Sequence, residues 1–405
     1  MNKTPSSFLP YGRQFIDDDD IAAVAAVLRS DLLTTGPAVV AFEDALSERM
    51  DGAEVVACAN GTAALHLAAM ALGLGPGDWA IVPAITFLAT ANAVRYVGAD
   101  VIFCDVDPTT GLMTAETLER AIAENTDKNI HAIFPVHLAG QPADPVGIAA
   151  VARRHGLAII EDACHALGTR FPGGSGDLVP VGACSHADMA IFSFHPVKTI
   201  ACGEGGAVST ADTGLAEKLR LFRSHGMTRN PDDFRNTDLA FGPDGAANPW
   251  YYEIAEPGYN YRLSDICAAL GASQLHKLDT FIEARQRIVA RYDKALKDLA
   301  PTAQPNGRVP GCDVGWHLYP VRIDFNTVCI DRATVMNRLR ELGVGTQVHY
   351  IPVPSQPYYQ NLYGGTVPPG AQTYYDQTLS LPLFPGLTDT DAERVVAALD
   401  ESLAA

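Results

Sequence analysis

The sequence predicts an α/β protein with a large domain on a mostly parallel sheet and a smaller α+β C-terminal domain. From Glu54 to Thr210, short apolar runs alternate with helix-length segments. That alternation is typical of parallel strands covered by helices on both faces. Around Pro249–Pro257 it gives way to aromatic residues and prolines, and a long helical region follows. The chain has 405 residues, more than one ordinary core accommodates.

The composition is that of a packed globular protein, with 47% hydrophobic and 19% charged residues. The net charge is −18 and no basic run is present, which argues against general nucleic-acid binding and anionic membrane surfaces. Residues 1–10 lack the apolar core of a signal peptide, and no apolar run could span a bilayer. The eight cysteines include no C-x-x-C pair, so we expect reduced thiols in a cytoplasm and no metal site.

The first helices follow an N-terminal arm, which we place at residues 1–20. Four acids, Asp17–Asp20, precede the apolar segment Ile21–Arg29. Acids at a helix start cap free amides and suit the helix dipole, so we interpret them as caps, with a metal site as the alternative. A second helix is expected at Ala38–Met50.

The large domain is predicted to cover residues 21–258. Its expected strands are Val55–Ala59, Trp79–Pro83, Val101–Val106, His131–Val136, Leu157–Glu161, Met189–Phe194 and Gly206–Thr210. The helices expected between them are Thr62–Leu72, Ala89–Val97, Ala115–Glu124 and Val146–His155. In such sheets, ligands bind beyond the carboxyl ends of the strands.

The small domain is predicted to cover residues 259–405. A helical region at Leu263–Leu299 opens it. Beyond that region we expect strands at Leu318–Phe325 and Thr346–Tyr350, and helices at Arg332–Leu342 and Asp389–Leu403.

The turn after the first strand is a candidate phosphate site. It reads Asn60-Gly-Thr-Ala, so a glycine turns the chain and a helix begins with free amides at Thr62 and Ala63. Such amides bind phosphate with the help of the helix dipole. A plain strand-to-helix turn remains the alternative.

Asp162 ends a later strand and is a candidate partner for a cationic ring. A carboxylate at this edge could keep a pyridine nitrogen protonated and so sustain an electron sink. Its neighbour Glu161 is expected to point to the opposite face, because strand side chains alternate. A simple helix cap is the alternative for Asp162, and His165 is expected either to contact a ring or to pack.

Lys198 follows the run that ends at Phe194 and is a candidate Schiff-base nucleophile. A lysine amine reacts with carbonyls when its surroundings leave it partly unprotonated. A solvated surface charge is the alternative for a lone lysine. Ser193 in the same run offers a hydroxyl for a phosphate, and Phe87 is expected to stack on an aromatic ligand or to join the core.

Five stretches occur in order along the chain and together resemble a known family. They are Asn60-Gly-Thr-Ala-Ala-Leu, Glu161-Asp-Ala-Cys-His, Phe192-Ser-Phe-His-Pro-Val-Lys, Gly205-Gly-Ala and Gly258-Tyr-Asn-Tyr-Arg-Leu-Ser-Asp. Each is weak alone, but the ordered set is similar to the DegT/DnrJ/EryC1/StrS family of pyridoxal-phosphate sugar aminotransferases. The resemblance runs from Tyr11 to the last helix.

The resemblance implies a fold-type-I aminotransferase with a mostly parallel seven-stranded sheet, and a homodimer with its active site at the dimer interface. Lys198 would attach pyridoxal 5'-phosphate and then move protons, while Asp162 would pair with the pyridine nitrogen. The other cofactor contacts it implies are Thr62, Ala63 and Ser193 at the phosphate, Phe87 and His165 at the ring, and Asn260 from the partner subunit. The substrate positions it implies are Tyr11, Thr34, Thr35, Arg262, His349 and Tyr350.

Within the family, the chain looks most like the branch that aminates C4 of a UDP-4-keto-6-deoxy-N-acetyl-altrosamine in the pseudaminic-acid pathway. The stretches that carry this likeness are Phe194-His-Pro-Val-Lys, Arg223-Ser-His-Gly-Met, Pro249-Trp-Tyr-Tyr-Glu, Gln347-Val-His-Tyr-Ile-Pro-Val and Gln356-Pro-Tyr-Tyr. Ala201-Cys202 departs from the expected pattern, in which threonines or similar residues stand. By resemblance, L-glutamate is the amino donor.

Other functions fit the sequence less well. Another nucleotide-linked keto sugar, of the GDP-perosamine type, or amination at C3 remains an alternative. Dehydratases of the same fold usually carry histidine where Lys198 stands. A non-catalytic binding or regulatory protein of this fold would not need Lys198, Asp162 and the phosphate turn together. A nicotinamide oxidoreductase would need an early G-x-G-x-x-G, which the chain lacks.

Overall fold

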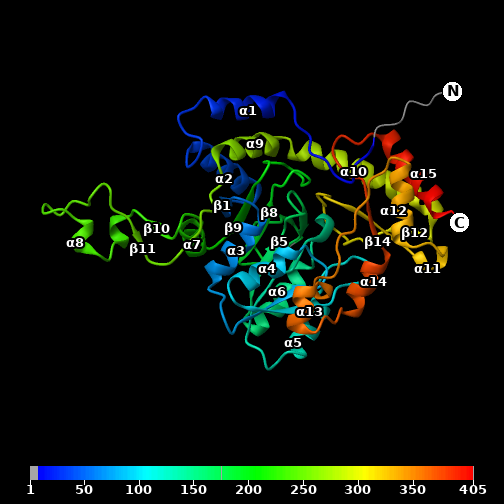
Figure 1. The fold of residues 1–405 in the computed structure, drawn as a ribbon, viewed down its shortest axis with the longest axis horizontal. Coiled ribbons are helices and arrows are strands. Elements are labelled where there is room, and N and C mark those ends of the chain that lie inside the picture. The colour runs from blue at the N-terminus through cyan, green and yellow to red at the C-terminus, as the bar shows by residue number, and fades with distance from the viewer. Residues whose placement is uncertain (1–7, 175, 405) are drawn as a thin grey trace.

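The structure is a computed structural model that describes residues 8–174 and 176–404 (Figure 1). Residues 1–7 of the predicted arm lie outside the described part. Within that part, no helix is long and apolar enough to cross a membrane.

A seven-stranded sheet forms the centre of the large domain, in the order β1-β9-β8-β5-β4-β2-β3. The strands are β1 (Glu54–Cys58), β2 (Trp79–Pro83), β3 (Asp100–Cys104), β4 (Ile130–Ile133), β5 (Ala158–Asp162), β8 (Met189–Ser193) and β9 (Gly206–Thr210). Pairing is parallel from β3 through β2, β4 and β5 to β8, whereas β9 is antiparallel to both of its neighbours. The predicted mostly parallel seven-stranded sheet is confirmed.

Helices cover both faces of this sheet, as the near-continuous apolar strands predict. They are α2 (Pro37–Arg49), α3 (Gly61–Leu72), α4 (Leu88–Tyr96), α5 (Ala115–Ala123), α6 (Pro145–His155) and α7 (Thr213–Arg223). Alternate strand residues serve the two faces: Val82 packs in the cluster with α3, α4 and α7, while its neighbour Ile81 packs in the cluster with α5 and α6. Two buried layers therefore hold the strand ends in register.

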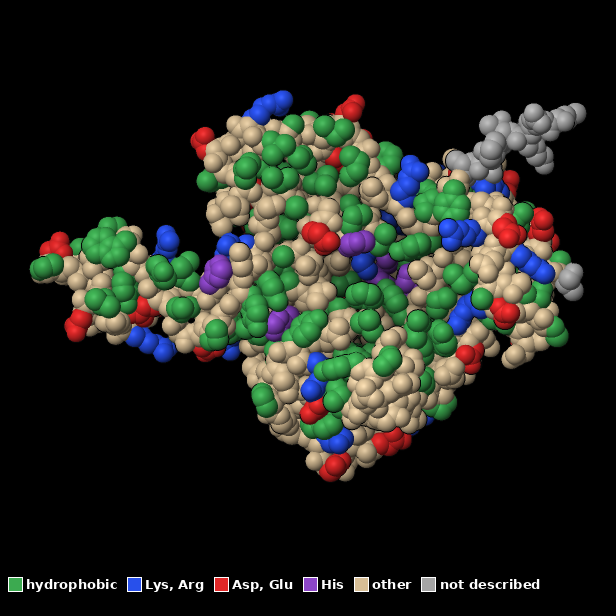
Figure 2. Space-filling view, viewed as in Figure 1, with side chains coloured by type: hydrophobic (Ala, Val, Ile, Leu, Met, Phe, Trp, Pro, Cys, Tyr) green, Lys and Arg blue, Asp and Glu red, His purple; other side chains and the backbone are tan. Residues whose placement is uncertain are grey.

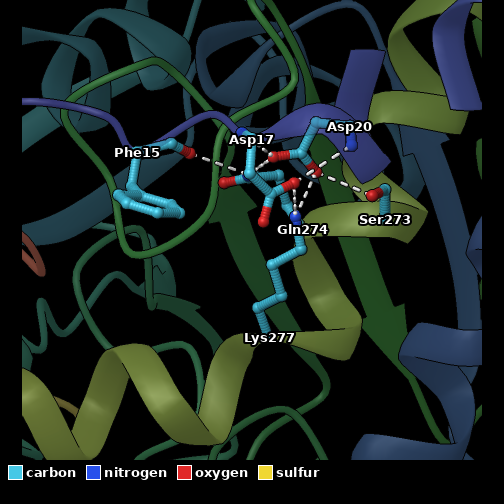
Figure 3. A network of polar contacts seen from close by, with 6 residues as sticks. All are labelled: Phe15, Asp17, Asp20, Ser273, Gln274 and Lys277. Atoms are coloured by element: carbon cyan, nitrogen blue, oxygen red, sulfur yellow. Dashed lines mark hydrogen bonds and ion pairs between the residues drawn. The ribbon is translucent and has the colours of Figure 1, made fainter. Parts of the chain in front are cut away.

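Helix α1 (Asp18–Leu28) lies along α9 (Asp265–His276) at the top of Figure 1. Asp17 and Asp20 form a capping box, which confirms the capping interpretation of the acidic run. The fully buried Asp20 also accepts hydrogen bonds from Ser273 and Gln274, and Lys277 forms ion pairs with both aspartates (Figure 3). This network fixes the start of α1, and with it the arm that carries Tyr11.

The smaller core lies on the right of Figure 1, near the C-terminal end of the described chain. Helices α10 (Leu278–Ala295), α12 (Arg332–Glu341) and α15 (Asp389–Leu403) pack with an antiparallel sheet of β12 (Ala303–Pro305), β13 (Tyr319–Ile323) and β14 (Thr378–Leu381). The predicted helical region Leu263–Leu299 is thus two helices, α9 and α10, and a short turn. Helix α9 packs against the large domain, in one cluster with α2.

The predicted strand Thr346–Tyr350 is wrong. In the structure this segment makes one isolated bridge, between Gln347 and Ser380. The place beside β13 is taken by β14, which the sequence analysis missed. His349 and Tyr350 instead line a cavity, described below.

The remaining elements are short. They are the hairpin β6 (Arg170–Pro172) and β7 (Leu178–Pro180), α11 (Phe325–Val328), α13 (Pro357–Tyr363), α14 (Pro369–Gln377) and 3₁₀ turns at Leu138–Gly140, Pro231–Asp233, Leu296–Leu299 and Val353–Ser355.

One segment projects away from the body on the left of Figure 1, with β10 (Met227–Thr228), α8 (Thr237–Ala240) and β11 (Glu253–Ile254). We call residues 227–256 the projecting arm, and its Trp250 is 73% exposed.

Candidate active site

A cavity of about 850 Å³ opens beyond the carboxyl ends of the central strands, between the sheet and the smaller domain. Figure 2 shows a hollow in this region with several histidine side chains gathered around it. Ten of the predicted site residues line the cavity: Tyr11, Thr62, Ala63, Phe87, Asp162, His165, Ser193, Lys198, His349 and Tyr350. The sheet edge predicted to carry a ligand therefore carries most of the candidate side chains.

Lys198 reaches the cavity from the turn that follows β8. Two backbone bonds shape this turn, from the Lys198 amide to His195 (2.8 Å) and from the Cys202 amide to Phe194 (2.8 Å). Burial lowers the pKa of the Lys198 amine, although Cys164 and Asp162 partly oppose the effect. A lowered pKa leaves more of the amine neutral near pH 7, which is what a nucleophile needs.

Asp162, at the end of β5, is held by two donors. The Thr90 hydroxyl donates to one carboxylate oxygen (2.7 Å), and the backbone amide of Cys164 donates to the other (3.2 Å). The carboxylate is buried at the cavity wall with its orientation fixed. Its neighbour Glu161 lies near a different group, with 3.5 Å between its carboxylate and His137 Nε2. A fixed carboxylate of this kind suits a cationic ring nitrogen.

The strand-to-helix turn after β1 lies against the end of β8. A Cβ added at Gly61 would come within 2.9 Å of the Ser193 Cβ, so only glycine allows this approach. The Asn60 side chain accepts the Ala63 amide (2.9 Å), so the helix cap occupies this amide. Gly61 and Thr62, whose amides begin α3 without a partner inside the helix, both line the cavity. Ser193 lines the same cavity end, so the turn can bind an anion.

His165, Tyr350 and His349 form a connected wall opposite the turn. The Ala139 amide donates to His165 Nδ1 (3.3 Å), so the neutral ring carries its proton on Nε2 and can donate to the Tyr350 oxygen (3.1 Å). Burial, then the charge of Lys198, lowers the pKa of His165 well below its usual value, and the same causes lower that of His349 to about 3. Burial raises the pKa of Tyr350 well above its usual value. All three rings are neutral at pH 7.

Two aromatic residues complete the mouth of the cavity. Phe87, just before α4, is 53% exposed, with its ring 5.9 Å from that of Tyr350. Tyr11 comes from the arm, where its carbonyl accepts the Leu383 amide (3.0 Å) and its ring lies 5.5 Å from that of His349. Phe87 thus offers a free face, whereas Tyr11 ties the arm to the smaller domain.

Four predicted residues do not line the cavity. Asn260 and Arg262 lie on a segment whose backbone bridges to Ser224 and Cys58, and Thr34 bridges to Ser264 on the same segment. Asn260, Thr34 and the adjacent Thr35 are exposed. These four residues lie together on the outside of the fold beside β1, and we call them the outer strip. Within the described chain none of them lines the cavity that holds Lys198.

The sequence analysis missed several residues of the cavity wall. Thr90 orients Asp162 through its hydroxyl. The sequence feature that could have identified Thr90 is its position on a predicted helix, three residues after Phe87. His317 lies with its ring 4.5 Å from that of His165, and burial, with the charges of neighbours, lowers its pKa well below its usual value. No pattern around His317 set it apart from other histidines. The other missed lining residues include Tyr96, Tyr261, Glu204 and Gln347.

These features fit one kind of cofactor. The amine of low pKa, the fixed carboxylate, the free aromatic face and the helix N-terminus lie around one cavity. A phosphorylated aromatic aldehyde with a ring nitrogen can meet all four at once, and pyridoxal 5'-phosphate is that molecule. Among the residues that the structure describes, no group of three or more histidine, cysteine or acidic side chains could hold a metal ion.

Comparison with known proteins agrees with this geometry. Residues 14–400 match the model of the DegT/DnrJ/EryC1/StrS aminotransferase family. The chain belongs to this family. Aminotransferases of the family use pyridoxal 5'-phosphate, so the cofactor is the one that the cavity fits.

Solved structures of similar proteins share the whole fold. Helicobacter pylori PseC, an aminotransferase involved in the biosynthesis of pseudoaminic acid, is 28% identical with a TM-score of 0.87, over 98% of this chain and 99% of that one. The putative sugar aminotransferase Spr1654 from Streptococcus pneumoniae, in its pyridoxal-phosphate form, is 27% identical with a TM-score of 0.84, over 98% of each chain. S. venezuelae DesV, solved with a ketimine intermediate, is 31% identical with a TM-score of 0.81, over 98% of this chain and 99% of that one.

Proposed function

We propose that this protein transfers the amino group of L-glutamate to C4 of a nucleotide-linked 4-keto-6-deoxy sugar. The sugar nucleotide that we propose is UDP-4-keto-6-deoxy-N-acetyl-altrosamine, on the route to pseudaminic acid. The observation that carries the proposal is the position of Lys198, whose amine of lowered pKa lines the same cavity as the fixed Asp162 carboxylate.

When bound, pyridoxal 5'-phosphate supplies a carbonyl for an amine and a cationic ring that withdraws electrons from the carbon next to the transferred nitrogen. Lys198 would hold the cofactor, and when its amine is free it would move protons as a general acid–base in both halves of the reaction. The lowered pKa makes more of this amine available as a base.

The other residues hold and orient. Asp162 keeps the ring nitrogen protonated, and Thr90 prevents the carboxylate from turning away. The Gly61 and Thr62 amides, with Ser193, would bind the phosphate, and Phe87 would cover one face of the ring. His165 holds the Tyr350 hydroxyl toward the cavity, where a phenol of raised pKa donates a hydrogen bond rather than carrying charge.

The proposed sugar rests on the likeness to PseC, an aminotransferase involved in the biosynthesis of pseudoaminic acid. At 28% identity, sugar and nucleotide can differ between two relatives, so the proposal needs its own test. DesV and Spr1654 are similar to this chain to nearly the same degree. PseC and Spr1654 are both described as aminotransferases.

We also propose a homodimer in which each cavity is completed by the outer strip of the second subunit. Exposed apolar side chains flank that strip, with Leu32 48% and Leu33 45% exposed. Asn260 is also exposed, outside the cavity of its own chain. A second copy across this face would bury the leucines and bring Asn260 to a cofactor.

The test is an amination assay on UDP-, GDP- and dTDP-linked 4-keto-6-deoxy sugars, with glutamate as donor and 2-oxoglutarate formation as the readout. We expect the UDP-linked N-acetyl sugar of the altro configuration to give the highest kcat/KM, with nitrogen at C4 by NMR. Faster amination of a GDP- or dTDP-linked sugar, or nitrogen at C3, would replace the proposed substrate and keep the aminotransferase. A Lys198→Ala control gives the background rate.

A further inference from the structure

A buried arginine lies directly behind Lys198. Arg285, on α10, is 1% exposed, one of the largest side chains that the fold buries completely. Its guanidinium donates to the Lys198 carbonyl (3.3 Å) and the Thr199 carbonyl (3.5 Å). Its Nε has no partner within the described residues. The contacts of its charged end therefore go to the turn that carries the reactive lysine.

Among the described residues, Arg285 is the one arginine that is buried, and it has no carboxylate partner. Arg49, Arg220 and Arg223 each pair with a carboxylate, whereas across residues 8–174 and 176–404 no ion pair involves Arg285. Burial lowers the pKa of its guanidinium to about 9, so the side chain is still a cation at neutral pH. A buried cation without a counter-ion is costly, and an apolar side chain of similar volume would be buried at lower cost. Fold stability alone therefore does not account for arginine here.

The hydrogen bonds from Arg285 to the carbonyls of Lys198 and Thr199 orient the turn that carries the lysine. Lys198 sits on a four-carbon chain, so the position of its amine depends on the direction in which its backbone leaves β8. The N-terminal half of the turn is fixed by a hydrogen bond inside the turn itself, from the Lys198 amide to the His195 carbonyl. On the far side, the carbonyls of Lys198 and Thr199 point to α10, where a planar fork of donors can meet two acceptors at once.

We propose that Arg285 is a positioning residue that holds the Lys198 amine in its working place by binding the carbonyls of Lys198 and Thr199. The proposal rests on the proposed role of Lys198 in amino transfer. Arg285 touches neither cofactor nor substrate, because it does not line the cavity. It acts on the reaction through the backbone of residues 198–199, and its charge also helps to lower the pKa of His317 in the cavity wall.

The experiment compares two substitutions. Arg285→Met keeps most of the length and removes the charge and the donors, whereas Arg285→Lys keeps the charge but has one nitrogen in place of the fork. Arg322→Met is the matched control, because Arg322 is a half-buried arginine of β13 in the smaller domain whose Nε also lacks a partner among the described residues.

The readouts use the glutamate half-reaction, which needs no sugar. We measure the rate at which glutamate converts the bound cofactor, the glutamate KM, and the fraction of cofactor that borohydride fixes to Lys198. For Arg285→Met we expect the rate to fall by about tenfold or more, because small misplacements of a reacting group are costly. We expect a smaller borohydride-fixed fraction, a KM within about twofold of wild type, an intermediate rate for Arg285→Lys and wild-type behaviour for Arg322→Met.

A second background separates positioning from general damage. In Lys198→Ala protein, methylamine supplies the missing base from solution, so the orientation of the turn no longer matters. There we expect Arg285→Met to change the methylamine-rescued rate by less than about twofold. An equal loss in both backgrounds overturns the proposal, and so does a wild-type half-reaction in Arg285→Met and Arg285→Lys. If Arg285→Met does not fold, Arg285→Lys in both backgrounds decides. Failure to aminate any sugar would overturn the proposed substrate and leave these readouts intact.

Discussion

The part of the cavity that carries Asp162 and Lys198, which we call the cofactor end, differs from the outer strip in burial and in its place relative to the cavity. At the cofactor end, Asp162 and Lys198 follow strands of a packed sheet. The Thr90 hydroxyl (2.7 Å) holds Asp162, and the bond from its own amide to His195 (2.8 Å) holds the turn of Lys198. On the outer strip, Thr34, Thr35 and Asn260 are exposed and do not line the cavity. One chain thus assembles the side chains of the cofactor end, whereas in the proposed homodimer the outer strip contributes to a cavity only when a second copy binds.

The largest expected effect tests the cofactor end. Lys198→Ala removes the amine that moves the proton, so we expect kcat for amination to fall by about 10⁴-fold, the upper range for general acid–base catalysis. The melting temperature should hold or rise, since a buried amine of lowered pKa contributes no favourable charge. Steady-state kinetics with a melting curve measures both. A fall of less than about tenfold would remove Lys198 from the reaction.

Asp162→Asn tests the electron sink with a side chain of the same shape. The amide keeps room for the Thr90 bond but cannot hold a ring nitrogen protonated. We expect retained cofactor and a kcat lower by about 10²- to 10³-fold, the usual cost of one preorganised electrostatic group. Thr90→Val is the milder companion, because it frees the carboxylate without removing it. Near-normal turnover in Asp162→Asn would contradict the role given to this carboxylate.

The neutral wall of the cavity predicts a loss of stability in acid. His349 has a folded-state pKa of about 3, against 6.5 in the unfolded chain, so below pH 6.5 the unfolded state binds more protons. Stability is therefore lost as pH falls, by about 2 kcal/mol between pH 7 and pH 5 from this residue. In urea unfolding, His349→Gln should lose about 2 kcal/mol less than wild type over that interval. Equal losses in wild type and His349→Gln would show that the ring is protonated in the fold.

Asn260→Ala tests the outer strip. If Asn260 serves the cavity of a second copy, we expect kcat/KM to fall by about tenfold, the cost of one lost hydrogen bond to a charged group. Mixing Asn260→Ala with Lys198→Ala protein should then restore activity to roughly one quarter of wild type, because random pairing gives half hybrid dimers with one intact site each. No restoration in a mixture shown to exchange subunits would place Asn260 in its own chain's site.

Thr34→Ala is expected to have the smallest effect. The side chain is exposed, so the free energy of unfolding should change by less than about 0.5 kcal/mol. The KM for the sugar nucleotide should rise by a few-fold, roughly one weak hydrogen bond, with kcat unchanged. An unchanged KM would remove Thr34 from the substrate positions.

The sequence predicts more residues of the cofactor end than of the rest of the cavity. Asp162 and Lys198 follow apolar runs, and alternation along a strand predicts which side chains emerge at its end. His317 has no such signal, because it is brought to His165 by the packing of the smaller domain. The segment Thr346–Tyr350 has the composition of a strand, but β14 occupies the place beside β13. Arg285 has no sequence signal either, and only its burial behind the lysine turn sets it apart.

The most direct test of the account is where the cofactor is attached. Protein purified with pyridoxal 5'-phosphate is reduced with borohydride and digested, and the peptides are weighed by mass spectrometry. We expect the added mass on the peptide that contains Lys198, its disappearance after prior incubation with glutamate, and none in Lys198→Ala protein. Added mass on another lysine, or on Lys198→Ala protein to the same extent, would contradict the assignment of this cavity as the aminotransferase site.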